Sequence, residues 1–364
     1  MEEKKEYLSQ QLITYIGNKR ALLDFIGQGI GKARRRISKG RLKIFDVFSG
    51  SGIVARYCKK FSDLLVVNDL EKYSAVINEC YLSNESEIDA ALLREYHGGL
   101  VEQASRGLAR GIISELYAPA DDAKINPGER VFYTSRNAMY IDTVRRLINK
   151  LPSEARKFFL APLLSEASIH VNTAGVFKGF YKNKSTGIGQ FGGKSRDALE
   201  RITGNINLPF PIFSNFDCET LIFGGDANKI IAAAPEVDIA YLDPPYNQHP
   251  YGSNYFMLNV INDYRRPESI SAVSGIPEKW NRSDYNKGSK ALRSLAELVA
   301  NIKAKCVLVS FNSEGFIGIE QMKNMLQKIG RVETLETKYN AFRGSRNLAG
   351  RGLHVREYLF LLEK

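Results

Sequence analysis

The sequence of 364 residues contains no apolar run that approaches the ~20 residues a helix needs to cross a bilayer. Its first residues, Met1–Lys5, are charged and no apolar segment follows them, which is not typical of a secretory signal. Only four cysteines occur, none in Cys-x-x-Cys spacing: Cys58, Cys80, Cys218 and Cys306. Their scarcity argues against a zinc or disulfide framework and predicts free thiols in a reducing compartment. We therefore expect a cytoplasmic protein without a membrane segment or a metal centre.

Acidic residues are scarce relative to basic ones. The chain has 51 Lys and Arg against 40 Asp and Glu, a net charge of +11 and a pI near 9.3. This balance favours a polyanionic partner, and nucleic acid is the first candidate. The basic residues gather in two segments rich in Gly, Asn and Ser, 178–201 and 338–356, as phosphate-contacting loops often do.

Internal repeats and low-complexity tracts are also absent, and 44% of the residues are hydrophobic, which is enough for a full core. Strand and helix alternate at both ends of the chain. Strands are predicted over 43–48, 64–68, 220–223, 237–242, 306–311, 332–338 and 355–362, the last two as an antiparallel pair. Helices are predicted over 19–39, from 53, over 74–82, 289–302 and 315–329, with a long loop before 289.

The alternation stops between 85 and 216, where the patterns over 90–116, 130–150 and 153–172 predict helices. We therefore predict an α/β fold with a mixed sheet formed by residues 1–84 and 217–364. The stretch 85–216 is predicted to be a separate, mostly helical insertion.

The first predicted strand runs into a glycine-rich turn, Asp46–Gly52, that opens a helix. Glycines there let the backbone pass close to a ligand at the helix N-terminus. Asp69 ends the next strand, 23 residues after Asp46, and is placed to accept hydrogen bonds from ribose hydroxyls. The pair indicates a nucleoside-containing cofactor, whose other charged part Asp46 meets. The plainer alternative is a tight turn with a helix-capping acid.

A second motif, Asp243-Pro244-Pro245-Tyr246, follows the apolar run 237–242. The carboxyl edge of an open α/β sheet is where ligands bind. The Asp243 carboxylate and the Pro244 carbonyl can both accept hydrogen bonds from one NH₂ group, which exposes the nitrogen lone pair. Tyr246 can stack on the ring that carries it, worth roughly 1–3 kcal/mol per base. The structural alternative is a helix cap followed by a proline-rich turn.

These motifs together resemble S-adenosylmethionine-dependent N6-adenine DNA methyltransferases. Tyr15–Lys19 is similar to the N-terminal cofactor motif of the Dam-like group, and the insertion falls between the two motif halves as in that group. Stretches similar to 247–255 and 342–347 point to the adenine methylases of type IIS restriction-modification systems. The resemblance covers most of the chain and is weakest over 85–155. It implies a Rossmann-like methyltransferase sheet, with 85–216 as the target-recognition part.

The resemblance also implies roles for the motif residues. Asp46 would meet the amino group of the methionine part of S-adenosylmethionine, and Asp69 would bind the ribose. The other implied cofactor-binding residues are Phe48, Gly50 and Gly52 as lining, Tyr15 and Lys19 at the carboxylate end, and Asp226 at the cofactor adenine. Asp226 is equally well placed as an ordinary helix N-cap. Asp243, Pro244, Pro245 and Tyr246 would hold and stack the target adenine, flipped out of the duplex.

Double-stranded DNA is the implied partner, with a cognate restriction endonuclease as a second, in a bacterial cytoplasm at the nucleoid. Expected DNA-contacting residues are Lys178, Lys182, Lys184, Asn247, Tyr255, Tyr339, Arg343 and Arg346. The loop 247–255 could cover the extruded adenine or fill the gap it leaves; ordinary loop packing is the alternative. Tyr339 or Phe342 could form the opposite wall of the base pocket, while Arg343 and Arg346 neutralise phosphates.

Three other functions fit parts of the sequence. An RNA N6-adenine methyltransferase would share the same catalytic motif, although the large insertion favours duplex DNA. A non-catalytic DNA-binding protein that kept the fold is opposed by the intact motifs at Asp46–Gly52 and Asp243–Tyr246. A nicotinamide dehydrogenase is disfavoured because the glycines lack Gly-x-Gly-x-x-Gly spacing.

Overall fold

The computed structural model describes residues 2–193, 198–340 and 354–364, with the side chains of 339, 340 and 354 left out. The strands are β1 Leu42–Asp46, β2 Ser62–Asp69, β3 Glu219–Gly224, β4 Val237–Leu242, β5 Ala304–Asn312, β6 Arg331–Asn340 and β7 His354–Glu363. The helices before the second half of the sheet are α1 Lys5–Ser9, α2 Leu23–Ile37, α3 Ile53–Cys58, α4 Lys72–Tyr81, α5 Ala90–Ser105, α6 Ile112–Tyr117, α7 Ser135–Ile148, α8 Ser153–Ile169 and α9 Leu199–Thr203. The helices that follow β3 in the chain are α10 Ala227–Ile230, α11 Tyr251–Asn254, α12 Phe256–Asp263, α13 Gly288–Asn301 and α14 Ile319–Gln327. Short 3-10 turns occupy Arg20–Leu22, Lys59–Phe61, Glu85–Glu87 and Asp284–Asn286.

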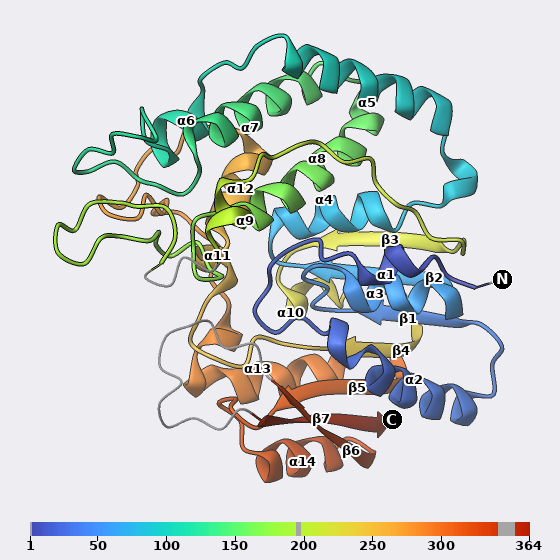
Figure 1. Cartoon of the computed structure of the whole chain (residues 1–364). Coiled ribbons are helices and arrows are strands. Elements are labelled where there is room, and N and C mark those ends of the chain that lie inside the picture. Colours follow the sequence, from blue (N-terminus) through green and yellow to red (C-terminus); the bar gives the residue numbers. More distant parts are fainter. Residues whose placement is uncertain (1, 194–197, 341–353) are drawn as a thin grey trace.

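The seven strands form one mixed sheet in the order β3-β2-β1-β4-β5-β7-β6 (Figure 1). Strands β1 to β5 are parallel, and β7 runs antiparallel to both β5 and β6. The register of β6 and β7 starts at Arg331 opposite Glu363 and ends at Asn340 opposite His354. The prediction of a mixed sheet with a C-terminal antiparallel pair is confirmed.

Alternating side chains of the sheet build two separate cores, because successive residues of a strand point to opposite faces. On one face Ile44 and Ile239 pack with helices α2 and α3. On the other face Phe45 and Ala240 pack with α10, α13 and α14. The central strand β4 is buried along its whole length, as expected for a parallel strand covered on both sides.

The strand order reverses direction between β1 and β4. On one side of this point β1 is followed in the sheet by β2, and on the other side β4 is followed by β5. Asp46, the last residue of β1, is in register with Tyr241, two residues before Asp243. The carboxyl ends of these two strands therefore open a crevice at the position where ligands bind in doubly wound sheets.

Helices α5 to α9 gather beyond the β3 edge of the sheet, with α4 between them and the strands (Figure 1). Their core also takes in Phe256, Met257, Leu258 and Ile261 of α12, a helix that follows β4 in the chain. Helix α12 packs on both α4 and α8. The helical part is thus formed by two separate segments of sequence.

Two predicted elements differ from the structure. The loop expected before residue 289 contains α11 and α12, because Phe256–Asp263 is an apolar run whose burial on most sides hides its helical period. The helix expected over 90–116 is divided into α5 and α6 around Gly107 and Gly111. Asp142 stabilises the N-terminus of α6 by accepting hydrogen bonds from the amides of Ile113 (3.0 Å) and Ser114 (2.9 Å).

Within the described ranges, no helix is both long and apolar enough to span a membrane.

Candidate active site at the carboxyl edge of the sheet

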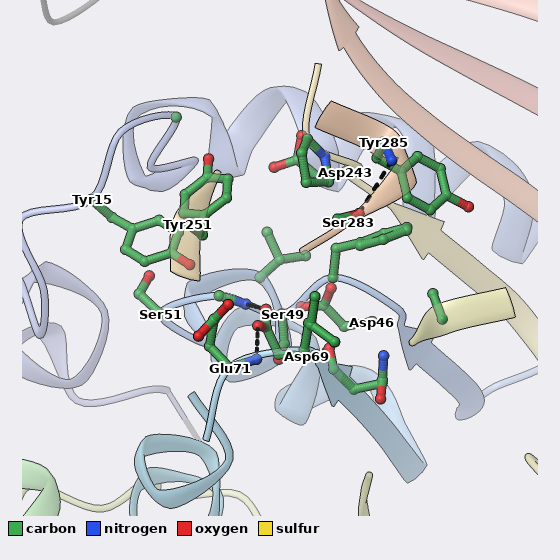
Figure 2. A pocket seen from close by; sticks show the side chains of 18 of the residues that line it. Tyr15, Asp46, Ser49, Ser51, Asp69, Glu71, Asp243, Tyr251, Ser283 and Tyr285 are labelled. Atoms are coloured by element: carbon green, nitrogen blue, oxygen red, sulfur yellow. Dashed lines mark hydrogen bonds between the residues drawn. The ribbon is translucent and has the colours of Figure 1, made fainter. Parts of the chain in front are cut away.

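One cavity lies where β1, β2 and β4 end. It contains about 920 Å³ of space not filled by atoms, open solvent at its mouth included. Asp46, Gly50, Asp69 and Asp243 all line it. Figure 2 shows Asp46 and Asp69 on one side and Asp243 across from them. The two motifs singled out in the sequence therefore share a single cavity.

The glycine-rich turn keeps its shape through conformations that only glycine adopts easily. Gly50 and Gly52 have φ of 52° and 72°. A Cβ on Gly52 would lie 2.4 Å from Asn78 Oδ1, and one on Gly50 would lie 3.0 Å from Tyr15 Cε1. The side chain of Asp69 fixes the turn by accepting a hydrogen bond from the Gly50 amide (2.8 Å).

Asp69 accepts a second backbone hydrogen bond, from the Glu71 amide (2.9 Å), so each of its oxygens already has a partner. Burial raises the pKa of Asp69 to about 6, and the amide hydrogen bonds from Glu71 and Gly50 oppose that shift. Asp69 therefore shapes the turn and still presents a carboxylate to the cavity.

Asp46 is buried (1% exposed) and neither of its oxygens receives a well-aligned hydrogen bond from the described residues. Burial raises its pKa well above the usual range, and nearby Asp243 and Asp69 raise it further. The amides of Ala55 and Phe48 lie near enough to lower it in part. A buried carboxylate in this state is well suited to a cationic ligand group.

Asp243 is in contact with a buried lysine. Lys19 Nζ lies 3.0 Å from Asp243 Oδ1 and 3.2 Å from Glu357 Oε1, and only 4% of the lysine side chain is exposed. The approach to Asp243 is an ion-pair contact without well-aligned hydrogen-bond geometry. Burial raises the pKa of Asp243 to about 6, Lys19 lowers it and Glu357 raises it. Lys19 also lines the cavity, and its place at the carboxylate end of a cofactor stays a prediction.

The rest of the motif encloses this carboxylate. Pro244 is buried, Pro245 lines the cavity, and the Tyr246 ring packs edge-on against Phe311 with centroids 6.1 Å apart. Lys19 Nζ lies 5.8 Å from the centre of the Tyr246 ring. The motif is therefore held by side chains from both ends of the chain.

Tyrosines form one end of the cavity. Tyr15 stacks on Tyr251 (4.8 Å between ring centroids) and on Tyr255 (4.7 Å). Tyr255 is fully buried, and its hydroxyl accepts a hydrogen bond from the Ile16 amide at 2.7 Å. This placement does not agree with the expected DNA contact of Tyr255, because its ring and hydroxyl are both enclosed by the protein. Its observed part is to fix the Tyr15–Lys19 segment.

Tyr251, from the predicted loop 247–255, lines the cavity. Other lining residues were not anticipated from the sequence: Glu71, Asn281, Ser283, Tyr285 and Asn286. Glu71 is buried, and its Oε2 accepts hydrogen bonds from Asn259 Nδ2 (2.6 Å) and Asn281 Nδ2 (3.3 Å). Burial and then Asp69 raise the pKa of Glu71 to about 7. Its position two residues after Asp69 was the one local signal that could have identified it.

Two further predicted cofactor residues line the cavity. Phe48 packs edge-on against Tyr285, with centroids 5.1 Å apart. Asp226 caps α10 by accepting a hydrogen bond from the Asn228 amide (2.9 Å) and is at the same time exposed to the cavity. Both alternatives considered for Asp226 are thus compatible with its position.

The expected DNA-contacting residues lie in different places. Lys178, Lys182 and Lys184 are exposed. The last two lie on a small hairpin closed by hydrogen bonds from the Asn183 amide to Ile188 O (2.8 Å) and from the Gln190 amide to Tyr181 O (3.0 Å). Asn247 is half-buried and accepts a hydrogen bond from Asn286 through its carbonyl. Arg343 and Arg346 lie outside the described residues, as does the side chain of Tyr339.

The basic loop approaches the segment after the Asp-Pro-Pro-Tyr motif. The Phe177 amide donates to Asn254 O at 2.7 Å. Lys178 lies close enough to His249 to add to burial in lowering the pKa of that imidazole. The loop therefore adjoins the cavity side of the molecule.

Among the described residues, no three His, Cys, Asp or Glu side chains are grouped as a metal site would require.

The sheet order, the antiparallel β7 and the acidic cavity at the carboxyl edge define a methyltransferase with a Rossmann-like fold. Within that class, the sequence model of the D12 class N6 adenine-specific DNA methyltransferases matches residues 15–325, and the chain belongs to this family. The protein is thus an adenine-specific DNA methyltransferase, which decides against the RNA and the non-catalytic alternatives.

Its relatives include two type II methyltransferases of similar length. M.NlaIII of Neisseria lactamica is 29% identical over 97% of this chain and 99% of its own. M.CviAII of Paramecium bursaria Chlorella virus 1 is 28% identical over 96% and 98%. The modification methylase StsI of Streptococcus sanguinis is 26% identical over 96% of this chain but 52% of its own length.

Proposed function

We propose that the protein transfers a methyl group from S-adenosylmethionine to N6 of an adenine turned out of duplex DNA, at one short recognition sequence. The observation that carries this proposal is the shared cavity of the glycine-rich turn and Asp243. A donor held by the turn and a base held by the Asp-Pro-Pro-Tyr motif would face each other within it.

The chemistry of the cavity fits this donor. When bound, S-adenosylmethionine supplies an electrophilic methyl carbon on a positively charged sulfonium. Asp46, with two buried oxygens that lack hydrogen-bond partners, would bind the ammonium of its methionine part. Asp69 and Glu71 would accept the ribose hydroxyls, and the rings of Phe48 and Tyr285 would pack on the adenine.

Asp243 and Pro244 would hold the amino group of the target base. The carboxylate and the backbone carbonyl would each accept a hydrogen bond from one N6–H group, which directs the nitrogen lone pair toward the methyl donor. The negative charge of Asp243 stabilises the positive charge that develops on N6. Tyr246 stacks on the base, which lowers the cost of extruding it from the duplex. The surplus proton leaves N6 after methyl transfer.

The helical part and the basic loops would read and grip the DNA. Residues 85–216 are proposed as the target-recognition insertion. Exposed Lys178, Lys182 and Lys184 on the loop beside the motif support this placement. The names of the relatives support a second proposal: the protein acts as the modification enzyme of a restriction-modification system, with a cognate endonuclease as its partner.

Methylation of mixed-sequence DNA by the purified protein, followed by single-molecule mapping of modified adenines, tests the activity and the site together. We expect N6-methyladenine at one short sequence. Asp243→Asn should reduce methyl transfer by about 10²-fold or more, since it removes the charge that stabilises the reacting nitrogen. Binding of labelled S-adenosylmethionine should persist in this variant.

Asp63→Asn is the matched control, because Asp63 is 63% exposed in a surface ion pair with Arg41. It should methylate like the wild type. Joint loss of transfer and cofactor binding in Asp243→Asn would instead make Asp243 a folding or cofactor residue. Wild-type methylation of RNA alone would refute the proposed substrate.

A further inference from the structure

Glu357 of β7 is a buried carboxylate next to the candidate catalytic group, although it does not line the cavity. It is 1% exposed and faces Lys19 and Ser310. Its Oε1 accepts a hydrogen bond from Ser310 Oγ (2.9 Å), while its Oε2 is buried without a hydrogen-bond partner in the described ranges. Such an oxygen costs free energy of folding, so its retention calls for a reason beyond packing.

The reason lies in the lysine between the two carboxylates. Lys19 Nζ is 3.0 Å from Asp243 Oδ1 and 3.2 Å from Glu357 Oε1. One ammonium therefore serves two carboxylates, and the group as a whole keeps a negative charge. With Asp243 as its only partner, the lysine would neutralise the carboxylate that has to stabilise a positive nitrogen.

The contact also orients Asp243. The oxygen next to Lys19, Oδ1, is buried, whereas the side chain as a whole is 17% exposed. Glu357 draws the ammonium to the inner side of Asp243, which leaves the Oδ2 side for a ligand. The ammonium cannot move away from Glu357 without leaving that buried carboxylate without a cationic partner.

We propose that Glu357 is a positioning residue for methyl transfer: it shares the Lys19 ammonium and anchors it on the inner side of Asp243. The lysine is then not left to neutralise Asp243 alone, and the outer side of Asp243 stays free to accept a hydrogen bond from the N6 amino group. This inference rests on the proposed role of Asp243. It assigns the β7 strand, remote in sequence from both motifs, a part in the reaction.

Charged and titratable groups around Asp243 come from every neighbouring element: Lys19 before α2, Asp46 of β1, Tyr241 of β4, Tyr246 after β4, Tyr251 of α11 and Glu357 of β7. Burial has the largest effect on the pKa of Asp243, and Lys19 and Glu357 act in opposite directions. A neutral side chain at position 357 no longer raises the pKa of Asp243, and Asp243 becomes the only carboxylate that pairs with Lys19. The pKa of Asp243 should then fall.

The test is a titration of the Asp243 carboxyl carbon by ¹³C NMR in full-length protein labelled at aspartate, with Asp243→Asn identifying the signal. The wild-type midpoint should lie near pH 6, because burial raises the pKa of Asp243 to about 6. In Glu357→Gln it should fall by about one pH unit, the size expected for one nearby charge. Glu357→Met, also neutral and of similar volume, should shift it in the same direction and guards against a folding defect of the first variant.

Glu363→Gln is the control on the same strand, since Glu363 is 42% exposed and pairs with Arg36 at 3.5 Å. Its Asp243 midpoint should equal that of the wild type. In both Glu357 variants the acid limb of the pH profile of kcat should move to lower pH, and kcat should fall by less than the ~10²-fold typical of a group that touches the reacting atoms.

An unchanged or raised Asp243 midpoint in folded Glu357→Gln and Glu357→Met would overturn the inference. The titration requires no turnover. A wild type without adenine methylation would therefore refute the proposed function, while the NMR midpoints would still decide whether Glu357 acts on Asp243.

Discussion

Two acids near the end of β2, Asp69 and Glu71, have different neighbours although they are two residues apart. Asp69 accepts hydrogen bonds from the backbone amides of Gly50 and Glu71 and so stabilises the glycine-rich turn. Glu71 Oε2 accepts hydrogen bonds from Nδ2 of Asn259 in α12 and from Nδ2 of Asn281 in a later loop. Glu71 thus joins three segments at the ribose side of the proposed cofactor site, and its pKa of about 7 makes it sensitive to neutral pH.

Glu71→Gln tests this at the residue scale. At pH 8 the wild-type side chain is a carboxylate, and a hydrogen bond to a charged acceptor is worth about 1.5–3 kcal/mol, so the variant should bind S-adenosylmethionine about tenfold or more weakly. Below pH 7 the wild type takes up a proton and its advantage should shrink. Calorimetric titrations from pH 5.5 to 8.5 measure both effects.

Glu95→Gln, a change of the same kind on the exposed surface of α5, should leave affinity and its pH dependence as in the wild type. Equal pH dependence of binding in Glu71→Gln and the wild type would show that Glu71 does not face the ligand.

At the scale of elements, the hairpin that carries Lys182 and Lys184 has a firm base. Asn172 donates from Nδ2 to Val131 O (2.7 Å) and Gln190 O (2.8 Å), and its Oδ1 accepts the Gly192 amide (3.0 Å). One buried amide side chain therefore ties both ends of the loop to the helical part. The lysines project from a supported tip, which suits contact with a regular phosphate backbone.

The double variant Lys182→Ala/Lys184→Ala should weaken DNA binding and reduce its salt dependence. Each phosphate contact contributes about −0.9 to the slope of log K against log salt concentration, so loss of two contacts changes the slope by about 1.8. Fluorescence anisotropy with a labelled duplex at several salt concentrations gives the slope. The control variant Lys303→Ala/Lys328→Ala removes two exposed lysines elsewhere on the protein. An equal change of the salt slope in this control would show that the hairpin lysines make no specific contact with the DNA.

The sequence indicated those elements whose signal is local. The apolar run 237–242 bounded by polar residues predicts β4, and glycines after Asp46 predict the turn. It did not indicate partners distant in the chain. Tyr255 looked like a base contact because it follows the Asp-Pro-Pro-Tyr motif, yet its partner is Ile16. Lys19 was assigned by motif alone. Its observed partners, Asp243 and Glu357, depend on the strand order of the sheet, in which β5 separates β4 from β7.

At the scale of the whole molecule, charge is divided by sign. The chain is basic with a net charge of +11, whereas its main cavity holds Asp46, Asp69, Glu71 and Asp243 around one lysine. The exterior attracts phosphates and the cavity attracts a cation. Burial raises the folded-state pKa of each of these acids above its usual value, and acidic neighbours raise it further for Asp46, Glu71 and Asp243. In the ligand-free protein these groups therefore oppose folding once they ionise.

The burial of these acids predicts how the stability of the protein depends on pH. Between about pH 4, near the unfolded pKa of an acid, and pH 6–7, the folded protein binds more protons than the unfolded chain, so stability falls as pH rises. The contribution of each group is on the order of 1–3 kcal/mol. The ligand-free protein should therefore have a higher Tm near pH 5.5 than near pH 8 at constant ionic strength.

Thermal unfolding with and without S-adenosylmethionine checks this prediction. The cationic ligand should raise Tm more at pH 8 than at pH 5.5, because it pairs with the acids once they are charged. A Tm that rises with pH in the ligand-free protein would contradict the raised pKa values of these buried acids.

Helix α12 is encoded after the catalytic motif, yet its apolar side chains complete the core of α5 to α8. Grafting residues 85–216 alone between relatives would leave Phe256, Met257 and Ile261 against a foreign surface. A working chimera has to bring 251–263 along as a second piece. With the proposed target-recognition role of the helical part, new sequence preferences would arise by point changes within an existing helical core more readily than by the exchange of one contiguous segment.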